Sequence, residues 1–260
     1  MLLSKIMNFL IHSPLEQFEV LNLVGISFPI LGYINFSLTN LGLYTIITVF
    51  LVLGLHFIIK NNKQIVPSRW TISLESGYAS VHGLVKAQIG QTNEIYLPFI
   101  YSVFFFLLIA NLNGNIPYGF TITTSLVVSM GLSVCIFLGV TILGLLRHGV
   151  HFFSFFVPSG TPLVLVPLLV PIELISYVSR AFSLGIRLFA NMVAGHTLLK
   201  ILSGFLAPMF TSSLLLSIIT LLPFTIFVGL IGLELAVSFI QAYVFTILVA
   251  SYLKDAIDLH

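Results

Sequence analysis

The sequence AFSLGIRLFANMVAGH, residues 181–196, decides the fold, because it is apolar enough to cross a membrane and yet carries Arg187 in its middle. It lies in an apolar segment that has no proline between Pro171 and Pro208. A helix of roughly 35 residues would be about 50 Å long, whereas the hydrocarbon core of a bilayer is about 30 Å thick. We therefore expect residues 172–207 to form a long, steeply tilted membrane helix, with a shorter ordinary span as the alternative.

The composition of the whole chain is typical of a multi-pass membrane protein. Of 260 residues, 58% are hydrophobic and 7% are charged, whereas a soluble domain usually carries about 25% charged residues. The apolar runs are continuous, which predicts helices rather than the alternating strands of a membrane barrel. A net charge of +2 is too small to suggest nucleic-acid binding. The single cysteine, Cys135, excludes an intramolecular disulfide and a thiolate metal cluster.

Hydropathy divides the rest of the chain into further segments. Residues 1–12 are apolar and could be a cleaved leader, and Ser13, Pro14 and Glu16 then show the spacing of a helix start. At 70–90, apolar residues recur at helical spacing among polar ones, which predicts an amphipathic helix on the membrane surface. A soluble loop helix is the alternative there. The remaining apolar runs predict membrane helices at 36–59, 95–116, 121–146 and, again without an internal proline, 223–258.

The expected fold is thus an all-α integral membrane protein. It contains one transmembrane helix, an amphipathic surface helix, a transmembrane hairpin, and then two long, steeply tilted membrane helices. Four prolines between Pro158 and Pro171 predict a broken connection before the first long helix. Lysine and arginine gather between residues 60 and 86 and at Arg147, which by the positive-inside rule places the N-terminus outside and the C-terminus inside.

Charged residues are rare between residues 149 and 253. A charge at the centre of a membrane helix costs roughly 2.5–3.5 kcal/mol on insertion scales, so such residues are expected to face a protein interior or a wet cavity. Glu173, Arg180 and Arg187 recur every seven residues, which returns to nearly the same helical face, and Asn191 lies one turn beyond. Arg180 could also be a purely structural ion-pair partner of Glu173.

A second set of polar residues falls elsewhere on the two long helices. His196 follows Arg187 by nine residues, which places it on the opposite face about 13 Å along the axis. Glu234 and Gln241 are seven residues apart, and Asp255 lies near the end of the last helix. On its own, His196 could be a helix-packing residue. Imidazole and carboxylate exchange protons near neutral pH and arginine does not, so the pattern indicates ion transfer between two polar clusters.

The same residues resemble a known family. SLGIRLFANMVAGH (183–196) closely resembles the signature helix of ATP synthase subunit a, the stator half of a rotary proton path. LELAVSFIQAYVFTILVASYLKDAIDLH (233–260) resembles the last helix of mitochondrial members, and SPLEQFEV (13–20) resembles fungal forms. The resemblance covers nearly the whole chain and is weakest before Ser13 and between Gly25 and Phe57.

The resemblance implies a non-catalytic proton-channel subunit without a cofactor, in which two offset half-channels carry protons to and from a carboxylate of the c-ring. Bacterial relatives exchange the histidine and the glutamate of one half-channel, which preserves the imidazole–carboxylate pair. The implied roles are Arg187 facing the ring carboxylate, His196 and Glu234 on the half-channel from the intermembrane space, Glu173 and Asp255 on the half-channel to the matrix, and Asn191 and Gln241 beside the arginine.

The resemblance also implies a place and partners. The place is the mitochondrial inner membrane, with the N-terminus in the intermembrane space and the C-terminus towards the matrix. The partners are the c-ring, the peripheral-stalk subunit b, small membrane accessory subunits and lipid. Two alternatives stay open. An ion-coupled secondary transporter would suit the broken helices but should show internal repeats, which the sequence lacks. A structural scaffold would leave Arg187, Glu173 and Glu234 unexplained.

Overall fold

The computed structural model describes residues 13–28, 34–61, 68–116, 119–157, 165–212 and 214–257. The expected leader at 1–12, the prolines at 158 and 162 and the last three residues lie outside the described residues. The fold class expected from the sequence is confirmed. Among these described residues, five helices are long and apolar enough to cross a membrane: α2 (Asn40–Asn61), α4 (Leu97–Gly114), α5 (Leu126–His148), α6 (Val166–Ser212) and α7 (Leu214–Ile257).

The N-terminal part contains a short hairpin that the sequence did not predict. A 3-10 helix η1 (Pro14–Phe18) is followed by strand β1 (Asn22–Phe28), which pairs antiparallel with β2 (Ile34–Thr39). The hydroxyl of Thr39 accepts the backbone N–H of Gly42 at 3.2 Å, which caps the start of α2. The side chain of Asn40 bonds the backbone of the incoming chain, to Leu21 N at 3.2 Å and Glu19 O at 3.0 Å. The first membrane helix therefore begins at Asn40, later than the sequence suggested.

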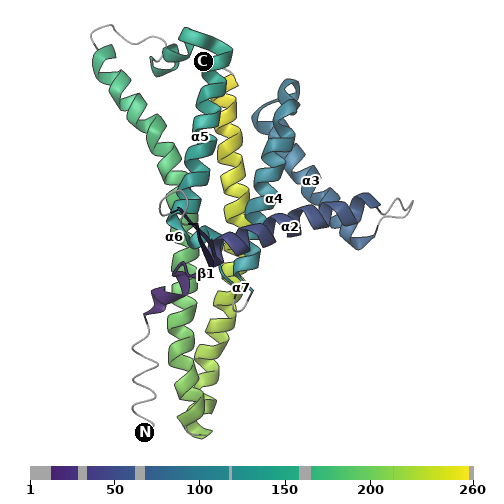
Figure 1. Ribbon diagram of the computed structural model, residues 1–260, viewed down its shortest axis with the longest axis vertical. Coiled ribbons are helices and arrows are strands. Elements are labelled where there is room, and N and C mark those ends of the chain that lie inside the picture. The colour runs from purple at the N-terminus through teal and green to yellow at the C-terminus, as the bar shows by residue number, and fades with distance from the viewer. Residues whose placement is uncertain are drawn as a thin grey trace.

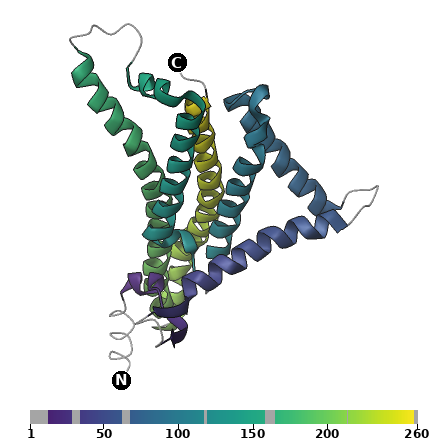
Figure 2. The same cartoon turned by 45° about the horizontal axis from the view of Figure 1, so that its top comes forward.

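The amphipathic segment forms α3 (Arg69–Gln88), which Ser68 caps through a hydrogen bond from Thr71 N to Ser68 Oγ at 3.4 Å. Val81 and Val85 of its apolar face are buried in the main hydrophobic core. A 3-10 turn η3 (Gln91–Tyr96) then leads into α4. Figures 1 and 2 show that α2 and α3 diverge from the other helices and meet at their far ends, so that α3 returns to the start of α4.

The two long helices extend beyond the prolines that were expected to bound them. Pro167 and Pro171 lie inside α6 with Pro208, and Pro223 lies inside α7. A proline in the first turn of a helix removes no needed donor, and neighbouring helices can satisfy backbone groups freed elsewhere in a membrane helix. At 1.5 Å per residue α6 is about 70 Å long, more than twice the thickness of the hydrocarbon core.

Helices α4 to α7 lie side by side and alternate in direction (Figures 1 and 2). The α4–α5 connection, which contains the short 3-10 helix η4 (Ile122–Thr124), is on the side of the molecule towards the α6–α7 junction, but α6 and α7 extend well beyond it (Figure 1). At the opposite end, η5 (Gly149–Phe156) follows α5. Gly185 brings α6 against α5, because an added Cβ would lie 3.0 Å from the Cα of Met130. This close approach fixes the position of α6 against α5.

Candidate functional site

The centre of the site is a histidine–carboxylate pair between α6 and α7. His196 Nδ1 lies 3.1 Å from Glu234 Oε1, and the two side chains are 15% and 9% exposed. Gly195 makes room for this approach, because a Cβ there would lie 2.9 Å from Glu234 Oε1. The sequence placed these two residues on facing helices by resemblance, and the structure brings them into direct contact.

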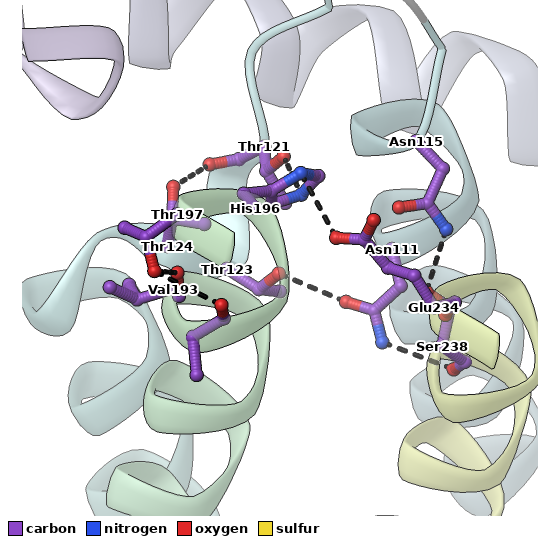
Figure 3. Close-up of polar contacts among 11 residues, drawn as sticks. Asn111, Asn115, Thr121, Thr123, Thr124, Val193, His196, Thr197, Glu234 and Ser238 are labelled. Carbon is purple, nitrogen blue, oxygen red and sulfur yellow. Dashed lines mark hydrogen bonds and ion pairs between the residues drawn. The ribbon is translucent and has the colours of Figure 1, made fainter. Parts of the chain in front are cut away.

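The second ring nitrogen of His196, Nε2, contacts a hydroxyl group. His196 Nε2 lies 2.9 Å from the hydroxyl oxygen of Thr121, in the connection between α4 and α5. Figure 3 shows the ring between this hydroxyl and the carboxylate of Glu234. The imidazole is therefore held on both nitrogens, by groups from two different elements.

A buried amide and hydroxyl network fixes the backbone that carries Glu234 (Figure 3). Ser238 Oγ donates to Glu234 O at 2.9 Å and accepts from Asn115 Nδ2 at 2.8 Å. Asn111 Nδ2 donates to Ser238 O at 3.3 Å, while its Oδ1 accepts from Thr123 Oγ1 at 2.9 Å. The network thus ties α7 to α4 and to the α4–α5 connection. Sequence reasoning missed these residues, although Asn111, Asn113 and Asn115 form a polar run in an otherwise apolar helix.

The pair lies at the end of a large cavity. This cavity has a volume of about 840 Å³, and its lining includes His196, Glu234, Lys200 and, from the N-terminal segments, Gln17 and Tyr44. We call it the vestibule. The ring of Phe18 in η1 lies 6.3 Å from that of His196, centroid to centroid, so the N-terminal segment forms part of the wall.

A second cavity lies on the other side of the carboxylate, between α6 and α7. It has a volume of about 350 Å³, and Asn191, Gln241 and Glu234 line it. Glu234 therefore borders both cavities. Asn191 and Gln241, which were expected beside the arginine, share this second cavity.

A separate ionic cluster lies towards the other end of the same helices. Arg180 Nη1 lies 3.1 Å from Asp255 Oδ2, and Arg180 Nη2 lies 3.8 Å from Glu173 Oε1. All three side chains are about a third exposed. The Arg180–Glu173 ion pair, which the sequence left as an alternative, is present, but the shorter contact joins Arg180 to Asp255. One guanidinium therefore holds both carboxylates of the expected second half-channel.

Arg187 lies between the two clusters along α6, and the described residues of its own chain do not cover it. The side of α6 that packs on its neighbours is occupied by Leu184, Leu188 and Met192. Arg187 does not lie on that side of the helix, and it is exposed. Within the described ranges, no hydrogen bond or ion pair reaches its guanidinium. The described residues also contain no group of three or more His, Cys, Asp or Glu that could hold a metal ion.

A membrane-embedded helix bundle that carries a proton-exchanging pair, an ionic cluster and an uncovered arginine along two helices has the features of an ion-translocating membrane protein. Residues 42–254 match the family described as ATP synthase A chain. The chain is similar to the ATP synthase subunit a of Mycosarcoma maydis, with 74% identity over 98% of this chain and 100% of the relative. It is also similar to those of Emericella nidulans, with 50% identity over 97% and 98%, and of Marchantia polymorpha, with 49% over 95% and 99%.

The chain therefore belongs to the ATP synthase A chain family. The function expected from the sequence is confirmed at this level: the chain is the proton-channel stator subunit of the ATP synthase membrane sector. It is a multi-pass protein of the mitochondrial inner membrane. The alternative of a secondary transporter finds no support.

Proposed function

We propose that the chain moves protons through two offset half-channels, one ending at the His196–Glu234 pair and the other at the Arg180 cluster. The subunit is itself non-catalytic, and ATP is made elsewhere in the complex. The observation that carries the proposal is the separation of the two polar clusters along the same two helices. Arg180 and His196 are 16 residues apart on α6, which is about 24 Å, and Glu234 and Asp255 are 21 residues apart on α7, about 31 Å. These lengths approach the thickness of the hydrocarbon core.

The inlet half-channel consists of the vestibule, the histidine–carboxylate pair and the second cavity. Water in the vestibule can deliver a proton to His196 or Glu234, which exchange protons near neutral pH. Because Glu234 also lines the cavity of Asn191 and Gln241, a proton can leave the pair towards the middle of α6. Arg187 is one turn from Asn191 on that helix.

Arg187 supplies a fixed positive charge at the midpoint. An exposed guanidinium without an ion-pair partner among the described residues is costly in a membrane, so a carboxylate from another chain is the chemistry that fits it. The resemblance to the family supports the c-ring carboxylate as this partner. Beside the arginine that carboxylate is favoured in its charged form and releases its proton. The guanidinium keeps its own proton, so it blocks direct transfer between the half-channels.

The outlet half-channel is the cluster of Glu173, Arg180 and Asp255. Arg180 orders two carboxylates that would otherwise repel each other, and their partial exposure leaves them accessible to water. The two carboxylates can therefore accept the released proton and pass it to solvent. In this reading Arg180 is a structural partner of the path and not itself a proton carrier.

The proposed orientation rests on the distribution of positive charge, and the remaining proposed partners rest on the resemblance to the family. Lys86, Arg147 and Lys254 lie in the last turns of α3, α5 and α7. These helix ends lie away from the α6–α7 junction (Figures 1 and 2), so the positive-inside rule directs them and the C-terminus to the matrix. The N-terminal segments and the vestibule then face the intermembrane space. The c-ring covers the Arg187 side, while subunit b, small accessory subunits and lipid cover other apolar faces.

Exchanging the paired residues tests the inlet. His196→Glu with Glu234→His keeps an imidazole facing a carboxylate, whereas His196→Ala and Glu234→Ala each remove one half of it. We expect the double exchange to conduct more protons than either alanine variant, in assembled complexes reconstituted in liposomes. If the exchange conducts no better than the alanine variants, with the same amount of assembled complex, the relay is not formed by this pair.

A further inference from the structure

We propose that Thr121 is the positioning residue of the inlet, which holds the imidazole of His196 towards Glu234 and completes its hydrogen bonding in every protonation state. The inference rests on the proposed relay and extends it to a residue that lies outside the two long helices. Thr121 belongs to the α4–α5 connection and is 4% exposed. Its role follows from its geometry, the chemistry of a hydroxyl, and the way in which the chain fixes it.

The geometry places one imidazole between two fixed groups. Thr121 Oγ1 lies 2.9 Å from His196 Nε2, and Glu234 Oε1 lies 3.1 Å from Nδ1 (Figure 3). A rotation of the ring away from Glu234 would also break the contact with Thr121. The hydroxyl therefore restrains the ring in the orientation that the relay requires, as outer partners orient the histidine ligands of metal sites.

A hydroxyl suits each state that a proton-carrying histidine passes through. It carries one donor and two acceptor lone pairs, and its hydrogen rotates to suit its partner. When the neutral ring carries its proton on Nδ1, Thr121 donates to Nε2. When the proton is on Nε2, the Thr121 hydroxyl oxygen accepts a hydrogen bond from Nε2–H. When both nitrogens are protonated, Thr121 and the Glu234 carboxylate each accept one bond. A valine side chain of the same shape can do none of these.

The chain fixes the hydroxyl in place from two sides. Gly114 at the end of α4 has no side chain, and a Cβ there would collide with the Thr121 hydroxyl. The backbone oxygen of Thr121 accepts a hydrogen bond from Thr124 Oγ1 at 2.6 Å. The position of Thr121 is therefore also set by its own connection and by α4, and not only by its contact with His196.

The pH response gives a signature of this role. The titratable side chains that line the vestibule with His196 are Glu234 of α7, Lys200 of α6 and Tyr44 of α2, and η1 contributes Gln17 and the ring of Phe18. The doubly protonated ring needs an acceptor on both nitrogens. Removing the hydroxyl disfavours that state, so the pH profile of proton flux on the inlet side should move towards acid.

The test uses the intact complex reconstituted in liposomes, with proton flux measured against the pH of the inlet side. The variants are Thr121→Val, which removes the hydroxyl, and Thr121→Ser, which restores it. The matched control is Thr246→Val, a buried threonine whose hydroxyl bonds Ala242 O of its own helix at 2.7 Å. We expect Thr121→Val to lose flux by roughly threefold to tenfold, the range of one buried hydrogen bond, with an acid-shifted profile. Thr121→Ser and the control should match the unaltered chain.

Two results would overturn the inference. One is a normal flux and pH profile in Thr121→Val while His196→Ala is blocked. The other is a Thr121→Ser variant as impaired as Thr121→Val. Normal conduction in His196→Ala would instead refute the relay itself, so the two failures are distinguishable. If Thr121→Val does not assemble, Thr121→Ala replaces it, because it removes the hydroxyl without adding a methyl group beside Gly114.

Discussion

Adding a single methyl group at Gly195 should uncouple the histidine–carboxylate pair without disturbing the fold. The Cβ of Gly195→Ala would lie 2.9 Å from Glu234 Oε1, 3.3 Å from its Cδ and 3.5 Å from its Cγ. The first distance is shorter than real Cβ contacts, and the atom that must yield is the tip of a flexible side chain. The carboxylate therefore turns away, and α6 itself does not have to move.

The size of the effect follows from these distances. A retreat of about 0.5 Å restores ordinary contact, and it can lengthen the 3.1 Å ion-pair contact between His196 Nδ1 and Glu234 Oε1 past about 3.5 Å, beyond which the two groups cannot form a direct hydrogen bond. A hydrogen bond to a charged group contributes about 1.5–3 kcal/mol, so we expect proton flux to fall by roughly 10-fold to 150-fold. Alanine is a better helix former than glycine by about 1 kcal/mol, so the variant should assemble normally.

The assay compares Gly195→Ala with Gly204→Ala in reconstituted complexes. Gly204 lies on the same helix, and a Cβ there meets nothing within 4 Å. Both variants gain the same helix propensity, so any difference in passive proton flux reports the contact with Glu234. Equal flux in the two variants, at equal complex content, would refute the reasoning that the close approach at Gly195 positions the carboxylate.

Two further predictions concern the rest of the path. Arg187→Lys and Arg187→Ala should both abolish coupled ATP synthesis while assembly survives, because lysine keeps a charge but loses the planar multi-donor head. Passive proton leak should rise more in Arg187→Ala, and normal coupled synthesis in that variant would show that the arginine is structural. Asp255→Asn removes the shorter contact of Arg180 and one outlet carboxylate, so coupled flux should fall while the thermal stability of the complex is unchanged, since a partly exposed pair is worth about 1 kcal/mol or less. A large loss of stability with unchanged flux would instead assign Asp255 a structural role.

Helical register predicted much of the site. The seven-residue spacing of Glu173 and Arg180 placed them on one face, and the structure pairs them. The nine-residue step from Arg187 to His196 predicted opposite faces. The structure agrees, since Arg187 is exposed while His196 turns towards α7. Within one helix, such faces depend only on a rotation of about 100° per residue, which the sequence fixes directly.

Helical register could not predict which residues of other segments hydrogen-bond to the site residues. Thr121 and His196 are 75 residues apart, and Asn111 and Ser238 are 127 apart. Register gives the face of a helix but not which connection covers it. The helix ends were also misplaced, because a proline that would end a helix in water can stand inside a membrane helix, as Pro171 and Pro223 do. The run of asparagines from Asn111 to Asn115 was the available signal for the network.

The contrast between the two arginines of α6 explains how one helix can serve both as scaffold and as working element. Arg180 contacts two carboxylates of its own chain. Its positive charge is therefore already balanced, and it attracts a further carboxylate only weakly. Arg187, seven residues later, has no ion pair among the described residues and is exposed. A charge that is not neutralised within the chain retains its full preference for an incoming carboxylate. Among the described residues no acid pairs with Arg187, which is the arrangement that the mobile carboxylate of our proposal requires, because an acid placed there would compete with it.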